Sequence, residues 1–384
     1  MTTHTFTGNI VTETEAFYGR LTTADDRIAD VAKLSACQEN AEWILPGFID
    51  VHVHGLGAVA SETLEDVSKM AEFGVHVGLT GFLPTVATVS FDRQVDFVAN
   101  MARFVAVPPS GRSRVLGSHL EGPFIAPANK GGMLEKFLLP PNLGQTEQLL
   151  RAADGTLRLM TISPELDGAA DVIRRLHQAG VTISAGHTNC NKTQLETAIE
   201  AGLSQICHIF DTFNGRLVDN GVSQPCLADL ALIDERLMLE LIPDGIHVPP
   251  ELVKLARLAA GARRLIAITD AVPGAGLPAG VFHLMDGREY TIAPDDVART
   301  NDSAGMILGS CLTLNRAFFN LTTRFGFTEI EAALMTSGNA ARNLGLGDRL
   351  GFLKPGYQAD IAILASDRLT VTRTLVAGET AYAA

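Results

Sequence analysis

The chain has 384 residues, of which 46% are hydrophobic, and it carries a formal net charge of −13. That length accommodates one large barrel together with a smaller domain. The acidic balance disfavours nucleic-acid and anionic-membrane partners, because both require clustered Lys and Arg. The sequence has neither a secretory signal pattern nor a run of about 18 uninterrupted apolar residues, so we expect no export or membrane insertion. Its five cysteines form no CxxC pair, which favours a reducing cytoplasm over a disulfide framework.

The two ends of the chain predict one small β-domain. Short extended pieces occupy residues 1–42, and strand-like runs at 359–364 and 369–378 are flanked by turn residues. We assign residues 1–45 and 350–384 to this discontinuous domain and residues 46–349 to a barrel. Such a domain requires the termini to meet, which a barrel allows because its first and last elements are neighbours.

Between the ends, short apolar runs alternate with amphipathic segments. We predict eight strands, over residues 43–54, 78–86, 115–121, 157–164, 181–187, 204–210, 237–244 and 265–270. The clearest helices are predicted over residues 62–75, 91–105, 169–179, 192–201 and 251–260. A glycine near the end of four of them is expected to form a left-handed C-cap: Gly74, Gly180, Gly202 and Gly261.

Groups of metal-type ligands stand at the C-terminal ends of these predicted strands. They are Asp50 to His54, His119 to Glu121, His187, His208 and Asp270. An open doubly wound sheet would show the same strand and helix alternation, but only a closed ring brings the first and eighth strand ends together. The predicted fold class is therefore α/β, a (β/α)8 TIM-type barrel with a small discontinuous β-sandwich domain built from both termini.

The spacing of the first group has a direct chemical meaning. Side chains at i and i+2 of a strand project to the same face, so His52 and His54 can bind one ion together. Imidazole nitrogen suits zinc and iron, and the carboxylate of Glu121 can bind one metal or bridge two. This pattern indicates a metal-dependent hydrolase.

Several longer motifs resemble one family. They are residues 46–55 (PGFIDVHVHG), 119–124 (HLEGPF), 185–188 (AGHT), 243–248 (PDGIHV), 268–271 (ITDA) and 350–360 (LGFLKPGYQAD). The chain resembles the amidohydrolase superfamily and, within it, the N-acetylglucosamine-6-phosphate deacetylases. The first motif is common to amidohydrolases in general, whereas the second and fourth are narrower and favour the amino-sugar deacetylases.

The resemblance implies roles for individual residues. Glu121, His187 and His208 would hold the principal metal, and His52 and His54, with Glu121 bridging, would hold a second. The implied cofactor is zinc, as one or two ions per subunit, with iron or another transition metal as the alternative. Because members of the family are often dimers, the resemblance also suggests a homodimer.

The resemblance further implies that Asp270 is the catalytic aspartate and that His247 contacts the sugar. An amide is a poor electrophile and its amine a poor leaving group, so Asp270 would take a proton from the attacking water and return it to the departing amine. The alternative for Asp270 is a helix N-cap after the strand. Its position at the eighth strand end favours catalysis.

Other positions depart from the family pattern. Met133 stands where members commonly carry a histidine, and Asp211 and Thr212 stand where they carry the Asn and Ala that bind the sugar phosphate. A carboxylate at position 211 repels a phosphate. The family's phosphate arginine has no clean match, which leaves Arg216 as its candidate substitute.

The predicted reaction is hydrolysis of the acetamide of an N-acetylated amino sugar, with N-acetylglucosamine-6-phosphate as the leading substrate. An unphosphorylated N-acetyl sugar or another N-acyl amide stays open. A catalytically inactive metal-binding scaffold is the alternative from another class, and the complete set of ligands together with Asp270 argues against it.

Overall fold

The computed structural model describes residues 2–384 except 88, 107–109, 214, 217, 285, 295 and 302–304. At its centre, parallel strands pair in chain order. They are β5 (Phe48–Val53), β8 (Leu79–Val86), β10 (Ser118–Glu121), β11 (Leu157–Ile162), β12 (Thr182–Ala185), β13 (Gln205–Ile206), β16 (Met238–Leu241) and β17 (Leu265–Ala267), with β9 (Arg114–Val115) beside β8. A bridge between Val53 and Ala271 and a 2.9 Å hydrogen bond from Asp270 N–H to the His52 carbonyl close the ring. The predicted (β/α)8 barrel is confirmed.

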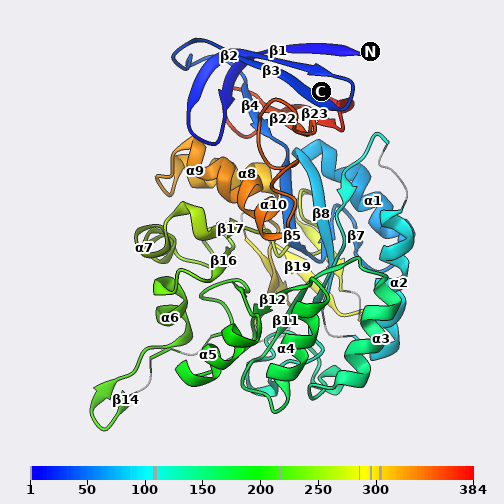
Figure 1. The fold of residues 1–384 in the computed structure, drawn as a ribbon, viewed down its shortest axis with the longest axis vertical. Coiled ribbons are helices and arrows are strands. Elements are labelled where there is room, and N and C mark those ends of the chain that lie inside the picture. The colour runs from blue at the N-terminus through cyan, green and yellow to red at the C-terminus, as the bar shows by residue number, and fades with distance from the viewer. Residues whose placement is uncertain are drawn as a thin grey trace.

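Helices surround this ring (Figure 1). They are α1 (Leu64–Gly74), α2 (Phe91–Val105), α3 (Leu143–Ala153), α4 (Ala169–Gln178), α5 (Lys192–Ala201), α6 (Leu227–Ile233), α7 (Pro250–Ala260), α8 (Leu314–Thr323), α9 (Glu329–Ala333) and α10 (Asn339–Asn343). In α4, for example, Val172 and Leu176 are buried while Asp171 and Arg174 form an exposed ion pair. This three-and-four spacing is why the sequence predicted α4 to within a residue.

The left-handed glycine caps were predicted correctly at two positions and wrongly at two. Gly180 and Gly202 have φ angles of 78° and 117°. Gly261 ends α7 with a φ of 71° but a ψ of 155°, outside the left-handed helical region. Gly74 instead has a helical φ of −54°. The chain continues through a short 3-10 helix, Val75–Val77, and the left-handed residue is Gly78.

Strands from the two ends of the chain form one seven-stranded sheet, in the order β24-β23-β22-β4-β1-β2-β3. Their bounds are β1 (Thr3–Val11), β2 (Ala16–Ala24), β3 (Arg27–Ser35), β4 (Trp43–Pro46), β22 (Ile361–Leu364), β23 (Val371–Val376) and β24 (Glu379–Ala383). Figure 1 shows the blue N-terminal strands beside the red C-terminal ones at one end of the molecule. Ile10, Leu21, Ile361 and Leu375 belong to a separate buried core there. The domain limits at 45/46 and 349/350 stay a prediction.

The first predicted strand, over residues 43–54, is in fact two strands in two sheets. β4 pairs with β1 and β22, whereas β5 pairs with β8 in the barrel. Gly47 separates them, and a Cβ there would lie 2.3 Å from the side chain of Thr80. Its N–H donates to the Asp360 carbonyl at 2.9 Å, and Ser337 Oγ donates to its carbonyl at 2.6 Å. The chain thus changes sheets at a residue that only glycine can occupy.

A four-stranded antiparallel sheet that the sequence did not predict lies between β17 and α8. Its strands are β18 (Gly280–His283), β19 (Glu289–Ile292), β20 (Ala298–Thr300) and β21 (Ile307–Gly309). Val272, Tyr290 and Ile292 belong to its own small core. Two short hairpins complete the strands: β6 (Gly55–Leu56) with β7 (Val59–Ala60), and β14 (Val218–Asp219) with β15 (Val222–Ser223). None of the described helices is long and apolar enough to cross a bilayer.

Candidate active site

Glu121, the last residue of β10, is the centre of a buried cluster of histidines. The Nε2 atoms of His187 and His208, which follow β12 and β13, each lie 3.0 Å from its Oε1. All three residues are at most 5% exposed. Their ligand atoms lie within 4.8 Å of one another, so this group could hold a metal ion.

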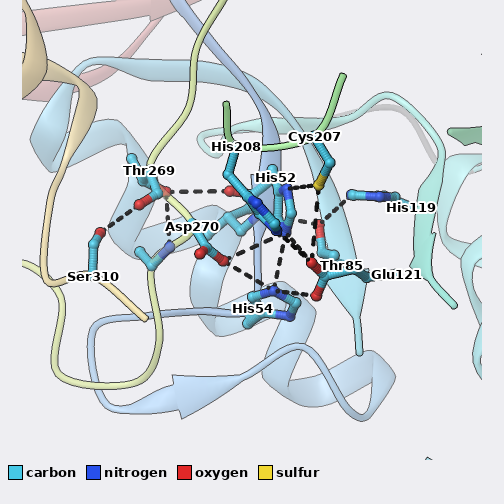
Figure 2. A network of polar contacts seen from close by, with 12 residues as sticks. His52, His54, Thr85, His119, Glu121, Cys207, His208, Thr269, Asp270 and Ser310 are labelled. Carbon is cyan, nitrogen blue, oxygen red and sulfur yellow. Dashed lines mark hydrogen bonds and ion pairs between the residues drawn. The ribbon is translucent and has the colours of Figure 1, made fainter. Parts of the chain in front are cut away.

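A second group adjoins the first through the same carboxylate. His52 and His54, from β5 and the residue just after it, have their Nε2 atoms 3.1 Å apart. Asp270 Oδ1 lies 3.4 Å from the first and 3.2 Å from the second, and Glu121 Oε2 lies 3.3 Å from His54 Nε2. Figure 2 shows His54 and Asp270 meeting beside Glu121. The structure therefore brings together all five predicted metal ligands and the predicted catalytic aspartate.

The spacing of these atoms suits a shared ion. Ligand atoms about 2.0–2.2 Å from a tetrahedral zinc ion lie roughly 3.3–3.6 Å from one another. The separations of 3.1 to 3.4 Å among His52, His54 and Asp270 are close to that range. The cluster as a whole places four imidazoles and two carboxylates close together in a buried position, and this donor set fits a divalent transition metal.

Backbone conformation aims three of these side chains into the barrel mouth. His187, His208 and Asp270 have φ angles of 50°, 23° and 48°. Residues other than glycine rarely adopt this left-handed region, and such outliers concentrate at functional sites. Each follows the end of its strand, so the turn out of the barrel itself sets the direction of the side chain.

Buried groups behind the cluster fix the orientation of the imidazoles. His52 Nδ1 lies 3.0 Å from Glu240 Oε2, and Glu240 is wholly buried in β16. Gln205 Nε2 donates to the other oxygen of this carboxylate. His187 Nδ1 donates to the Asn129 carbonyl at 2.9 Å. These contacts leave the Nε2 atoms of both histidines free to face a metal.

The sequence interpretation missed Glu240. A signal was present, because a glutamate in the apolar strand MLEL is costly to bury without a purpose. His119 occupies a related position below the cluster, with its nitrogens 3.2 Å from Thr85 Oγ1 and 2.9 Å from Thr161 Oγ1.

The cluster keeps both functional carboxylates ionised. Burial alone would raise the pKa of Glu121, but the charge of His52 and His187 and hydrogen bonds from His187 and His208 hold that pKa well below its usual value. Burial likewise opposes ionisation of Asp270, yet His52 and a hydrogen bond from His54 lower its pKa. An ionised Asp270 can accept a proton.

The cluster lies at the floor of a cavity of about 410 Å³. Three of the predicted substrate contacts, Asp211, Thr212 and His247, line this cavity. His247 Nδ1 lies 2.6 Å from Asp244 Oδ2, which fixes its ring. Thr212 Oγ1 is buried and, among the described residues, has no hydrogen-bond partner.

The fourth predicted contact, Arg216, is placed differently. Its guanidinium pairs with Asp229 at 2.7 Å, and its side chain is 65% exposed. It is not among the described residues that line the cavity. Its role in phosphate binding stays a prediction.

The far side of the cavity comes largely from the four-stranded insertion. Asp286, Arg288 and Leu308 line it there, together with Met133 from the loop after β10. Arg288 donates to the Gly132 carbonyl at 2.9 Å and to Asp286 at 2.8 Å. It is the only Lys or Arg among the described lining residues. The sequence interpretation missed Arg288, because nothing in the strand pattern indicated that this segment returns to the barrel mouth.

A parallel barrel with histidines and carboxylates clustered at its C-terminal rim defines the class of metal-dependent barrel hydrolases. Residues 43–381 match the amidohydrolase family model, and the chain belongs to this family. The predicted resemblance is confirmed.

Individual relatives cover nearly the whole chain. An N-acetylgalactosamine-6-phosphate deacetylase of Escherichia coli O157:H7 is 32% identical, with 90% of each chain covered. An N-acetylglucosamine-6-phosphate deacetylase of Bacillus subtilis (strain 168) is 31% identical, covering 88% of this chain and 84% of the relative. Among solved structures, a mutant N-acetyl-D-glucosamine-6-phosphate deacetylase of Mycobacterium smegmatis, in complex with N-acetyl-D-glucosamine-6-phosphate, is 29% identical. It superposes with a TM-score of 0.90 over 99% of this chain and 100% of that one.

Proposed function

We propose that this amidohydrolase removes the acetyl group from an N-acetylated amino sugar 6-phosphate, releasing acetate and the amino sugar phosphate. N-acetylglucosamine-6-phosphate is the leading substrate. The observation that carries the proposal is the position of Asp270, 3.2 Å from His54 and at the floor of the cavity. The similarity to sugar-phosphate deacetylases over most of the chain supports the choice of substrate class.

Within this proposal, Glu121, His187 and His208 hold the principal metal, and His52 and His54 share a second with Glu121. Zinc is the proposed ion, because imidazole and carboxylate ligands in a tight cluster suit it, although the same ligands also accept iron. The chemistry that a divalent ion would supply there is polarisation of the amide carbonyl and a lowered pKa of the attacking water. Glu240 and the Asn129 carbonyl orient the two histidine rings that they contact.

Asp270 moves the proton in this mechanism. Its lowered pKa leaves it ionised, so it accepts a proton from the attacking water. It then delivers that proton to the amine nitrogen as the C–N bond breaks, because an unprotonated amine is too basic to leave. The amide is thereby split into acetate and an amine, and Asp270 returns to its carboxylate form.

The cavity wall supplies the proposed sugar contacts. His247 offers a polar group, Thr212 lines the same cavity, and Asp211 can accept hydrogen bonds from sugar hydroxyls. Arg288 is the proposed phosphate contact, because a guanidinium binds phosphate strongly and Arg288 is the cation at this surface. Asp211 and Asp286 oppose a phosphate, and for this reason an unphosphorylated N-acetyl sugar is kept as a second candidate.

We further propose a cytoplasmic homodimer. The five cysteines are all free thiols in the structure, which suits a reducing compartment. The dimer rests on family resemblance.

The test is to measure amine release by metal-assayed protein from N-acetylglucosamine-6-phosphate, N-acetylgalactosamine-6-phosphate and N-acetylglucosamine in parallel. We expect turnover of a phosphorylated sugar with a kcat/KM at least tenfold above that of N-acetylglucosamine. Preference for the unphosphorylated sugar would establish the second candidate. Turnover of none of the three by metal-loaded protein would overturn the deacetylase assignment.

A further inference from the structure

A second cavity, of about 320 Å³, lies at the opposite end of the barrel strands. Its wall includes β9, the start of β11, the end of α2 and the segment that follows α10. Val115 in this wall precedes Glu121 by six residues on an extended part of the chain, which corresponds to roughly 20 Å. The second cavity is therefore separate from the candidate active site.

The charged residues that line this cavity are all arginines: Arg112, Arg114, Arg158 and Arg349. No Asp or Glu is among its described lining residues. A concentration of positive charge is unexpected in a chain with a net charge of −13. Like charges held in one concave surface repel each other, and a bound anion relieves that repulsion.

Two of the four guanidinium groups are already engaged. Arg114 pairs with Asp360 at 2.6 Å. Arg112 donates to Ser68 Oγ at 2.8 Å and stacks over Phe104, with 4.8 Å between its guanidinium carbon and the ring centroid. These contacts fix two arginines in the cavity wall without neutralising Arg112.

The other two, Arg158 and Arg349, have no side-chain hydrogen bond or ion pair with any described residue. The Nε atom of Arg158 is buried and unsatisfied. A buried donor without a partner is costly, so its presence calls for an acceptor that comes from outside the chain.

We propose that this arginine cavity binds a small phosphate-bearing anion. Guanidinium groups recognise phosphate through paired, charge-assisted hydrogen bonds, and Arg158 and Arg349 have such donors available. Phe104, Leu346 and Leu350 provide an apolar wall, which suits an organic phosphate whose carbon skeleton packs against them. Arg112 adds a third positive charge, and Arg114 anchors the rim to the terminal sheet through Asp360.

The experiment is isothermal titration of the full-length, metal-loaded protein with inorganic phosphate and, separately, with glycerol 3-phosphate. The test variant carries Arg158→Gln and Arg349→Gln. The matched control carries Arg174→Gln and Arg263→Gln, which remove the same charge from exposed positions. Deacetylase turnover and circular dichroism verify that each variant is folded.

We expect wild type and control to bind at least one of these anions with equal affinity, and the test variant to bind it at least tenfold more weakly. Binding of both anions would identify the phosphate group as the recognised feature, whereas binding of glycerol 3-phosphate alone would identify an organic phosphate. Arg349 is exposed, so Arg349→Gln alone provides a second variant that leaves the interior intact. Absence of binding to wild type, or equal affinity in the test variant, would overturn the proposal.

Discussion

The two walls of the candidate active-site cavity differ in how they are built. The inner wall, defined by His54, Glu121, His187, His208 and Asp270, stands on the ends of barrel strands that pair with one another. The outer wall, defined by Met133, Asp286, Arg288 and Leu308, stands on a loop and on the inserted sheet. Reaction chemistry needs fixed geometry, which the closed ring provides, whereas substrate choice can vary with an insertion that leaves the ring unchanged.

The first prediction tests the inner wall as a whole. Removal of divalent metal with a chelator should abolish amine release, because the proposed mechanism relies on the metal to polarise the amide carbonyl and to activate water. Thermal unfolding should shift to lower temperature, since a ligand at about 1,000 times its Kd stabilises the fold by about 4 kcal/mol. Zinc added back should restore both. Full activity in protein shown by elemental analysis to be metal-free would contradict the assignment.

Substitution of the proton carrier should have the next largest effect. Asp270→Asn keeps the shape of the side chain but cannot accept the proton, so kcat should fall by about 10²- to 10⁴-fold. The metal held by Glu121, His187 and His208 should be retained, because these three ligands are intact. Asp171→Asn, at an exposed position of α4, is the matched control. An active Asp270→Asn variant would remove Asp270 from the mechanism.

Glu240 tests whether the inner wall depends on the residues behind it. Glu240→Gln should weaken metal binding or activity by about 10- to 100-fold, because an amide is a weaker partner for His52 Nδ1 than a carboxylate. Metal competition with a chromogenic chelator measures the affinity directly. The exposed Glu235→Gln should behave as wild type, and equal affinities in both variants would show that Glu240 only fills space.

Substitution of Arg288 tests the outer wall. We expect this substitution to have the smallest effect on activity and to affect only the phosphorylated substrate. Arg288→Met should raise KM for N-acetylglucosamine-6-phosphate about tenfold to a hundredfold. The reason is that a hydrogen bond to a charged group contributes about 1.5–3 kcal/mol to binding. Both kcat and the kinetics with N-acetylglucosamine should stay nearly unchanged. Arg299→Met, from the same insertion but outside the cavity lining, is the control. Equal KM increases for both sugars would show that Arg288 shapes the wall and does not bind phosphate.

The sequence predicted the inner wall because its residues obey a local rule. His52, Glu121, His187, His208 and Asp270 each lie at or just after the end of an apolar strand, and barrel closure brings such ends together whatever the loops do. The eight strands were recognisable for the same reason, although the change of sheet at Gly47 was not. That change depends on Thr80, Ser337 and Asp360, which are remote in sequence.

The outer wall could not be predicted in this way. Arg288 reaches the cavity only because β18 to β21 fold back as an independent sheet. The rule that the ends of barrel strands meet at one rim does not predict where an inserted sheet lies. Arg216 was considered because it lies near the second metal histidine in sequence, but its side chain pairs with Asp229. Proximity in sequence does not determine which way a loop side chain points, so the role of Arg216 stays a prediction.

The position of β4 in the terminal sheet bears on how the chain folds during synthesis. β4 lies between β1 and β22, so one of its edges is unpaired until residues 361–364 leave the ribosome. An unpaired edge is open to pairing with other chains. The barrel is translated while that edge is still exposed, and β22 covers it only after the barrel strands and helices have emerged. Pairing with β22 therefore removes an edge that stays open while the barrel is being translated.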